Sequence, residues 1–179
     1  MKAILLAAGS GMRLGDLTKE TPKALVDING KTLLERQIIA LQKNNINDII
    51  VVTGPNNDKF DIKDITCIHD SNYLEHDVLG TMMSASEYMN SDVIISYTDI
   101  VFDEKIIHSI KNVNNDINIA VEMDWTKTYV DRTEHPIDEA ANVLIEDGLV
   151  KKIGHQTKRF GFFKKDSLGE FLGIMKLSQ

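Results

Sequence analysis

The sequence predicts an α/β protein with a doubly wound, mostly parallel sheet and a C-terminal β-hairpin extension. Three observations support this fold. Continuous apolar runs alternate with helical patterns, the first run ends in a glycine-rich loop, and short strands and turns replace the helices after residue 140. Apolar runs of this kind are typical of strands buried on both faces, and their alternation with helices favours parallel pairing.

The individual elements follow from local patterns along the chain. KAILLAA at 2–8 is apolar throughout and stops at a glycine, as a buried strand would. Asp147-Gly148 lies between two β-rich segments and predicts a hairpin turn. The helical face of 31–45 carries Leu33, Leu34, Gln37, Ile38 and Leu41. The expected strands are 2–8, 48–54, 65–70, 92–99, 117–123 and 170–178 with the hairpin 142–154, and the expected helices are 31–45, 103–112 and one near 81–90.

Composition limits the possible partners. The chain has 179 residues, 42% of them hydrophobic and 26% charged, which suits one soluble globular domain. A net charge of -7 argues against broad binding of DNA or RNA, which needs a basic face. The single cysteine, Cys67, excludes an intrachain disulfide, and the sequence offers no apolar run long enough to span a membrane. We expect a cytoplasmic protein without a membrane partner, and a homo-oligomer remains open.

The loop after the first expected strand, ILLAAGSGMRLGDLTKETPKALV at 4–26, has the residues of an anion site. Gly9 and Gly11 allow the backbone to approach a ligand and turn its N–H groups toward an anion. Arg13 offers a planar fork for two phosphate oxygens, and Lys23 offers a mobile point charge after the extended pair Thr21-Pro22. The Walker and dinucleotide glycine patterns are both absent from the loop. The alternative is a connection whose glycines serve only the turn.

The segment LLAAGSGMRLGDLTKETPKALVDINGKTLLERQI resembles the signature of nucleotidyltransferases that activate sugar phosphates and related phosphate or phosphonate compounds. These include phosphocholine and phosphonate cytidylyltransferases and the MobA-like NTP transferases. The resemblance continues through DIIVVTG, LGT and YTD. It implies a Rossmann-like nucleotidyltransferase fold in a single domain over 1–179, with a nucleotide-binding half at 1–105 and an acceptor-side half at 106–179.

The resemblance also implies roles for the opening loop. Gly9 and Gly11 would hold a nucleoside triphosphate, and Arg13 would neutralise its β- and γ-phosphates. Lys23 would bridge to the incoming substrate phosphate. The backbone of Ala7 and Ala8 would line the base.

Two later motifs carry further implied roles. Gly80 and Thr81 would meet a pyrimidine edge, although the same residues could be a helix N-terminus with Thr81 as its cap. Asp99 would bind Mg²⁺, which prefers hard oxygen ligands, although an aspartate after a strand can also serve only a turn. Asp103 is expected to be the N-cap of the next helix rather than a second ligand.

The segment DWTKTYVDRTEHPIDEAANV at 124–143 resembles the acceptor side of the phosphocholine and phosphonate branch. Trp125 and Tyr129 could face an amine through a cation–π contact. Alternatively, because they lie four residues apart, they could belong to the core. Lys151 and Lys152 could contact the acceptor phosphate or lie on a solvated face. None of the five histidines has metal-site spacing, and all but His135 are expected to be structural or on the surface. The candidate acceptor residues are Trp125, Tyr129, Arg132, His135 and Glu139.

The resulting prediction is a Mg²⁺-dependent nucleotidyltransferase that moves a nucleoside monophosphate, CMP by preference, from an NTP to a phosphate or phosphonate acceptor and releases pyrophosphate. One alternative is a sugar-1-phosphate uridylyl- or guanylyltransferase. Another is a weakened nucleotide-binding homologue, because relatives continue beyond the equivalent of Gln179 with a segment that supplies a second metal aspartate. An NAD-dependent oxidoreductase is disfavoured, since the acid expected to hold the ribose, Glu35, lies within a predicted helix.

Overall fold

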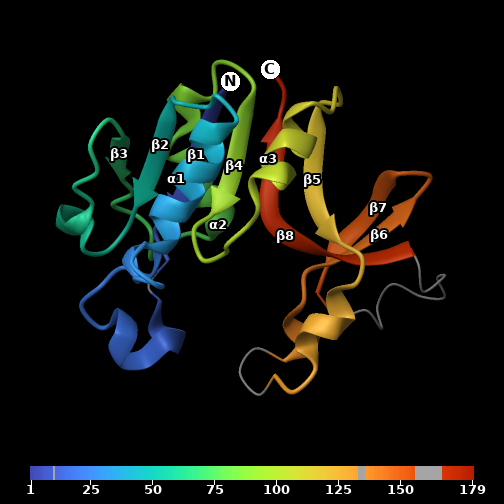
Figure 1. The fold of residues 1–179 in the computed structure, drawn as a ribbon, viewed down its shortest axis with the longest axis horizontal. Coiled ribbons are helices and arrows are strands. Elements are labelled where there is room, and N and C mark those ends of the chain that lie inside the picture. Colours follow the sequence, from blue (N-terminus) through green and yellow to red (C-terminus); the bar gives the residue numbers. More distant parts are fainter. Residues whose placement is uncertain (10, 133–135, 156–166) are drawn as a thin grey trace. The chain divides into compact units, whose positions relative to one another are not determined.

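The computed structural model describes residues 1–9, 11–132, 136–155 and 167–179, apart from the side chains of Met12 and Arg13. The chain forms two compact units (Figure 1). Unit 1 comprises Met1–Asn118 and Gly173–Gln179, and unit 2 comprises Ile119–Leu172. Within the described ranges, the helices are too short or too polar to cross a bilayer. The sequence predicts a single domain with halves at 1–105 and 106–179, and that organisation stays a prediction.

Unit 1 is built on a parallel sheet. Its strands pair in the order β3-β2-β1-β4, and the C-terminal part of a long strand, β8, pairs antiparallel with β4. The interior strands are buried on both faces, which explains their mainly apolar sequences. The strands are β1 (Lys2–Ala7), β2 (Ile49–Thr53), β3 (Thr66–His69), β4 (Val93–Tyr97) and β8 (Leu168–Leu177).

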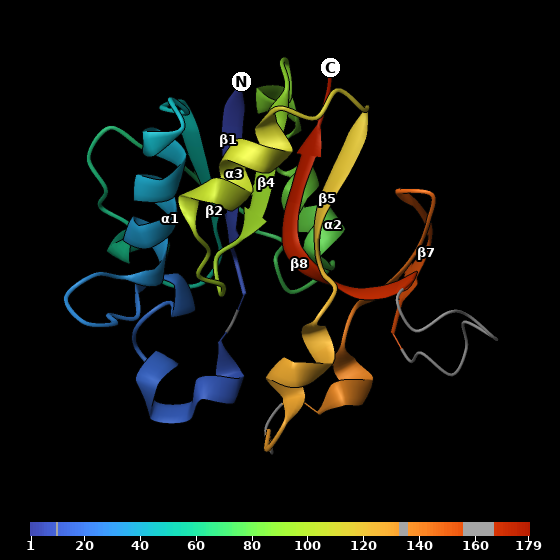
Figure 2. The same ribbon diagram turned by 45° about the vertical axis from the view of Figure 1, so that its right-hand side comes forward.

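Helices cover both faces of this sheet, as a doubly wound fold requires (Figures 1 and 2). Helices α1 (Leu33–Lys43) and α3 (Glu104–Lys111) pack on one face, and the short helix α2 (Val78–Met83) lies on the other. A reciprocal capping box between Thr32 and Glu35 starts α1, and Asp103 caps α3 as predicted. The helix expected near 81–90 begins earlier and ends at Met83, because Asp77 caps it and a 3₁₀ turn follows.

Unit 2 contains the short strands expected after residue 140. β6 (Asn142–Glu146) and β7 (Leu149–Gly154) form an antiparallel hairpin, and β6 also pairs with the first part of β8. Asp147 and Gly148 both have positive φ, as a two-residue hairpin turn with right-handed strand twist needs. Strand β5 (Ile117–Glu122) leads into the unit. The predicted hairpin extension is therefore confirmed.

Candidate nucleotide site

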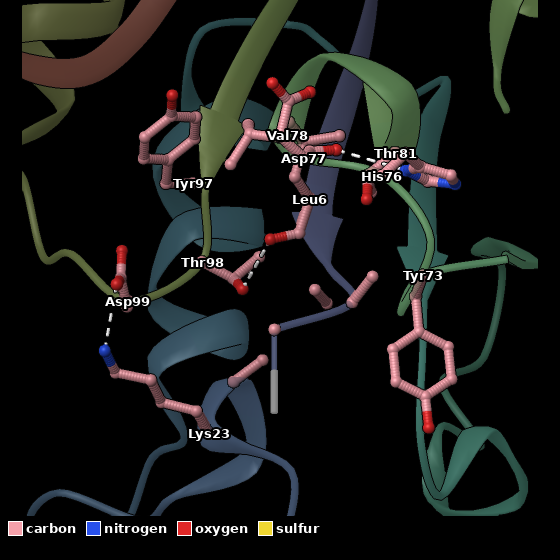
Figure 3. Close-up of a pocket in the computed structure, with 14 residues that line it drawn as sticks. Leu6, Lys23, Tyr73, His76, Asp77, Val78, Thr81, Tyr97, Thr98 and Asp99 are labelled. Atoms are coloured by element: carbon pink, nitrogen blue, oxygen red, sulfur yellow. Dashed lines mark hydrogen bonds and ion pairs between the residues drawn. The ribbon is translucent and has the colours of Figure 1, made fainter. Parts of the chain in front are cut away.

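A cavity of about 300 Å³ opens in unit 1 where β1 and β4 end (Figure 3). The carboxyl ends of parallel strands are the usual position of ligands in α/β sheets. Its walls come from the end of β1, the turn after β4, the loop that carries Lys23, and the segment before α2. The lining residues are Leu6, Ala7, Ala8, Gly9, Lys23, Ala24, Tyr73, His76, Asp77, Val78, Thr81, Tyr97, Thr98 and Asp99.

The loop after β1 lines the cavity with Gly9 and turns at a left-handed glycine, Gly11, which is not among the lining residues. Gly11 has φ of +66°, and a Cβ there would approach Thr18 Cβ to 3.1 Å. The Thr18 hydroxyl donates to the Gly11 carbonyl at 2.7 Å and closes the turn. A residue with a side chain would be strained at this position, so the turn explains Gly11 independently of any ligand. The side chain of Arg13 lies outside the part of the chain that is described, and its phosphate role stays a prediction.

Lys23 and Asp99, which are far apart in the sequence, meet at the cavity. Lys23 begins a 3₁₀ turn directly after Pro22, and Asp99 lies two residues beyond β4. Lys23 Nζ donates to Asp99 Oδ2 at 2.9 Å (Figure 3). Their side chains are 34% and 43% exposed, so both can also reach a ligand. A cation and a carboxylate therefore neutralise each other in the place where the sequence predicts a phosphate and a metal.

The carboxylate of Asp99 suits Mg²⁺ as one donor of several. In the described ranges, no group of three or more His, Cys, Asp or Glu side chains is arranged to hold a metal by itself. Mg²⁺ is commonly bound by one or two carboxylates together with substrate phosphates and water. A partly exposed hard oxygen beside an anion site fits this mode of binding. Lys23 bonds to one oxygen of this carboxylate, Oδ2, so a metal would bind the other oxygen or displace the lysine.

The N-terminus of α2 forms another wall of the cavity. The Asp77 carboxylate accepts from the N–H groups of Leu79 at 3.0 Å and Gly80 at 3.3 Å, and it is the cap of the helix. The alternative prediction that Thr81 is the cap is therefore wrong. Thr81 is buried and lines the cavity. A Cβ at Gly80 would come within 2.3 Å of the His76 ring, so Gly80 makes room for that histidine.

His76 is held by a buried carboxylate. Its Nε2 lies 3.1 Å from Asp70 Oδ1, and the Asp70 side chain is only 2% exposed. The Asp77 carbonyl 3.2 Å from Nδ1 raises the pKa of His76, partial desolvation opposes this, and Asp70 raises it further. The protonated imidazole is therefore more stable here than in an ordinary exposed histidine.

Several lining residues were not identified from the sequence. Tyr73, His76 and Asp77 belong to none of the motifs, and the sequence predicts His76 to be structural or on the surface. A histidine that follows an apolar strand and an aspartate gives little indication of a cavity wall. The pairing of Asp70 and His76 across a loop is the feature that fixes it there.

The candidate acceptor residues lie in unit 2, and the aromatic pair forms its core. Trp125 and Tyr129 are 4% and 8% exposed and pack with Ala140 and Leu168. Their rings meet edge to face at 5.8 Å, and the Trp125 indole N–H donates to the Leu168 carbonyl at 3.1 Å. This packing gives both residues a structural role, and contact with an acceptor stays a prediction.

The polar members of the candidate acceptor set surround that core. The Tyr129 hydroxyl bonds to Glu170, which raises the pKa of Tyr129 together with burial, the larger cause. The Arg132 guanidinium lies 4.8 Å from the centre of the Tyr129 ring, as a cation–π contact. The Glu139 carbonyl lies 3.0 Å from His155 Nδ1. His135 lies outside the described residues. Lys151 and Lys152 are exposed on β7, which favours the solvated alternative.

The fold and the site define a nucleotidyltransferase, and comparison with known families agrees. The model of the MobA-like NTP transferase domain matches residues 3–144, so the chain belongs to this family. The predicted class of enzyme is thereby confirmed.

Several relatives of this chain are cytidylyltransferases. The chain is 30% identical to CTP:phosphoglutamine cytidylyltransferase of Campylobacter jejuni over 99% of its own length and 73% of that protein. It is 36% identical to choline-phosphate cytidylyltransferase of Haemophilus influenzae over 59% of its length and 47% of that protein. The chain thus spans less than half of the choline-phosphate enzyme.

Solved structures share the fold over nearly the whole chain. The inositol-1-phosphate CTP transferase from T. maritima superposes with a TM-score of 0.75 at 19% identity, covering 99% of this chain and 70% of that one. The CTP:phosphocholine cytidylyltransferase from Streptococcus pneumoniae gives 0.70 at 23% identity, covering 99% and 71%. These similarities confirm the predicted nucleotidyltransferase fold.

Proposed function

We propose that the protein transfers CMP from CTP to a small phosphorylated or phosphonate acceptor and releases pyrophosphate. The observation that carries this proposal is the meeting of Lys23 and Asp99, 2.9 Å apart, beside the backbone of Ala7, Ala8 and Gly9 at one cavity. The cytidylyltransferases among the relatives favour CTP as the nucleotide. A cytoplasmic location, where CTP is available, is part of the proposal.

The reaction needs charge neutralisation and positioning rather than a general base. An acceptor phosphate oxygen is already an anion, so it can attack the α-phosphorus in line. A new P–O bond forms as the bond to the pyrophosphate oxygen breaks. Lys23, released from Asp99, would lie between acceptor and nucleotide phosphates and reduce their repulsion. Arg13 would hold the β- and γ-phosphates.

Mg²⁺ is the proposed cofactor, and Asp99 is the residue that would hold it. When bound, the ion would neutralise charge on the nucleotide phosphates. The lysine and the metal would then both act on phosphate groups, instead of the lysine and the carboxylate acting on each other.

Base selection would depend on the wall beside α2. The Gly80 N–H already bonds to Asp77, so of the groups predicted to meet a base edge, the Thr81 side chain and the backbone of Ala7 and Ala8 are the ones that line the cavity. A short hydroxyl suits a pyrimidine better than a purine, which needs more room. We expect CTP to bind several-fold more tightly than GTP or ATP, with UTP as the nearest competitor, since one matched hydrogen bond contributes about 1 kcal/mol.

Pyrophosphate release tests the proposal directly. Each of the four NTPs would be assayed against phosphocholine, aminoethylphosphonate, phosphoglutamine and a set of sugar 1-phosphates. Turnover with CTP and an amine-bearing or amide-bearing acceptor supports the proposal. Turnover with UTP or GTP and a sugar 1-phosphate supports the second candidate, which a sugar-1-phosphate nucleotidylyltransferase 37% identical over 72% of this chain also favours. CTP binding without turnover would indicate a weakened homologue.

A further inference from the structure

One polar side chain interrupts the apolar face of α1. Of the buried residues in this fully described helix, Leu33, Leu34, Ile38, Ala40 and Leu41 are apolar, and Gln37 is an amide. Gln37 is 1% exposed. Removing an amide from water is costly unless hydrogen bonds replace the lost ones. The partners of Gln37 therefore indicate why it is there.

Both partners lie in the turn that carries Asp99. Gln37 Nε2 donates to the Tyr97 carbonyl at 2.8 Å and to the Ile100 carbonyl at 2.7 Å. These two carbonyls flank Thr98 and Asp99 in the chain. Tyr97 is the last residue of β4, and carbonyls beyond a strand end leave the sheet's own hydrogen-bonding ladder. One side chain of α1 thus binds the turn on both sides of Asp99.

A second bond ties the same turn to β1. The Thr98 hydroxyl donates to the Leu6 carbonyl at 2.9 Å in a buried position (Figure 3). Thr98 is therefore bonded to β1. Tyr97 and Ile100 are bonded to α1 through Gln37. The Asp99 side chain itself remains free to face the cavity and Lys23 (Figure 3).

We propose that Gln37 is a positioning residue that holds the Asp99 carboxylate where it can bind the metal of the nucleotide complex. This inference rests on the proposed function. A leucine or methionine would fill the apolar face of α1 as well. What the amide adds is the pair of bonds to the turn. Within the described part of the molecule, its Oε1 has no hydrogen-bond partner, so the donor bonds alone account for its burial.

The test compares CTP affinity in MgCl₂ with CTP affinity in EDTA, measured by calorimetry for each variant. Gln37→Met keeps the length of the side chain and removes both donors. Gln42→Met is the matched control, since Gln42 is exposed on the same helix. Asp99→Asn gives the effect of Mg²⁺ on CTP affinity that is expected when the carboxylate is lost.

We expect Mg²⁺ to strengthen CTP binding in the wild type and in Gln42→Met by the same factor. In Gln37→Met, the strengthening of CTP binding by Mg²⁺ should be roughly tenfold smaller than in the wild type, because two hydrogen bonds to carbonyls are lost. The affinity of this variant for CTP in EDTA should stay near that of the wild type. A role confined to stability would lower the melting temperature and leave the Mg²⁺ factor unchanged. That result would overturn the proposal.

Two further outcomes are informative. If Gln37→Met does not fold, Gln37→Leu takes its place, because leucine also suits the apolar face of α1 and cannot donate to the two carbonyls; a Mg²⁺ factor equal to wild type in that variant would refute the inference. If the wild type itself gains nothing from Mg²⁺, the metal role of Asp99 fails together with this inference. The first failure appears only in the variant, and the second appears in the wild type, so they are distinguishable.

Discussion

The two units use their polar and aromatic side chains in different ways. In unit 1, Lys23, Asp99 and His76 face a cavity, where Lys23 and Asp99 bond to each other and His76 is held by the buried Asp70. In unit 2, Trp125 and Tyr129 are enclosed by their own neighbours, with their polar atoms bonded to Leu168 and Glu170. The comparison teaches that charged side chains partly exposed at a cavity can still reach a ligand, whereas aromatic side chains enclosed by their neighbours serve the core.

The largest expected effect concerns Lys23. Lys23→Met removes the charge that would act between two phosphates, so turnover should fall roughly 100-fold or more. Pyrophosphate release with CTP and the best acceptor measures this. Lys127→Met is the control in unit 2, because Lys127 pairs with Asp124 on the surface and should be dispensable. An equal loss of turnover in Lys23→Met and Lys127→Met would contradict the prediction that the lysine of unit 1 has the larger role.

A smaller effect is expected for Tyr129. Tyr129→Phe removes the bond to Glu170, and the free energy of unfolding should fall by about 1.5–3 kcal/mol, as for a hydrogen bond to a charged group. The KM for the acceptor should not change if the residue is purely structural. Chemical denaturation and steady-state kinetics measure the two quantities. Tyr73→Phe, at the unit 1 cavity, is the matched control for stability. A higher KM with unchanged stability would instead favour acceptor contact.

The smallest expected effect is the pH dependence contributed by His76. Folding raises its pKa above the ordinary 6.5, so the folded state binds the proton more tightly than the unfolded state. The contribution to stability is complete below pH 6.5 and is lost as the pH rises through the folded pKa. An NMR titration of the His76 ring in the wild type and in Asp70→Asn measures the shift. The same pKa in both would exclude a contribution from Asp70.

Most of the fold could be predicted because its signals are local. Apolar runs such as 48–54 and the turn residues Asp147-Gly148 specify their elements within a few residues. The family resemblance assigned Lys23 and Asp99 to one nucleotide site, but the bond between the two side chains was not predicted. Tyr73 and His76 were not predicted, since their position depends on a loop fixed by the Asp70 contact. Gln37 stood in the predicted helical face, where an amide among leucines was the available signal.

The division of β8 between the units has a consequence for how the chain folds. Val93 and Leu177 pair in the sheet, yet lie roughly 80 residues apart in the chain, and such distant pairings form slowly. Unit 2 is one continuous stretch, so during synthesis all of it leaves the ribosome before Gly173–Gln179 can complete unit 1. Until then, β4 exposes an unpaired edge that could bind other nascent chains. Arrival of the last strand closes that edge and ends the period of greatest risk of aggregation.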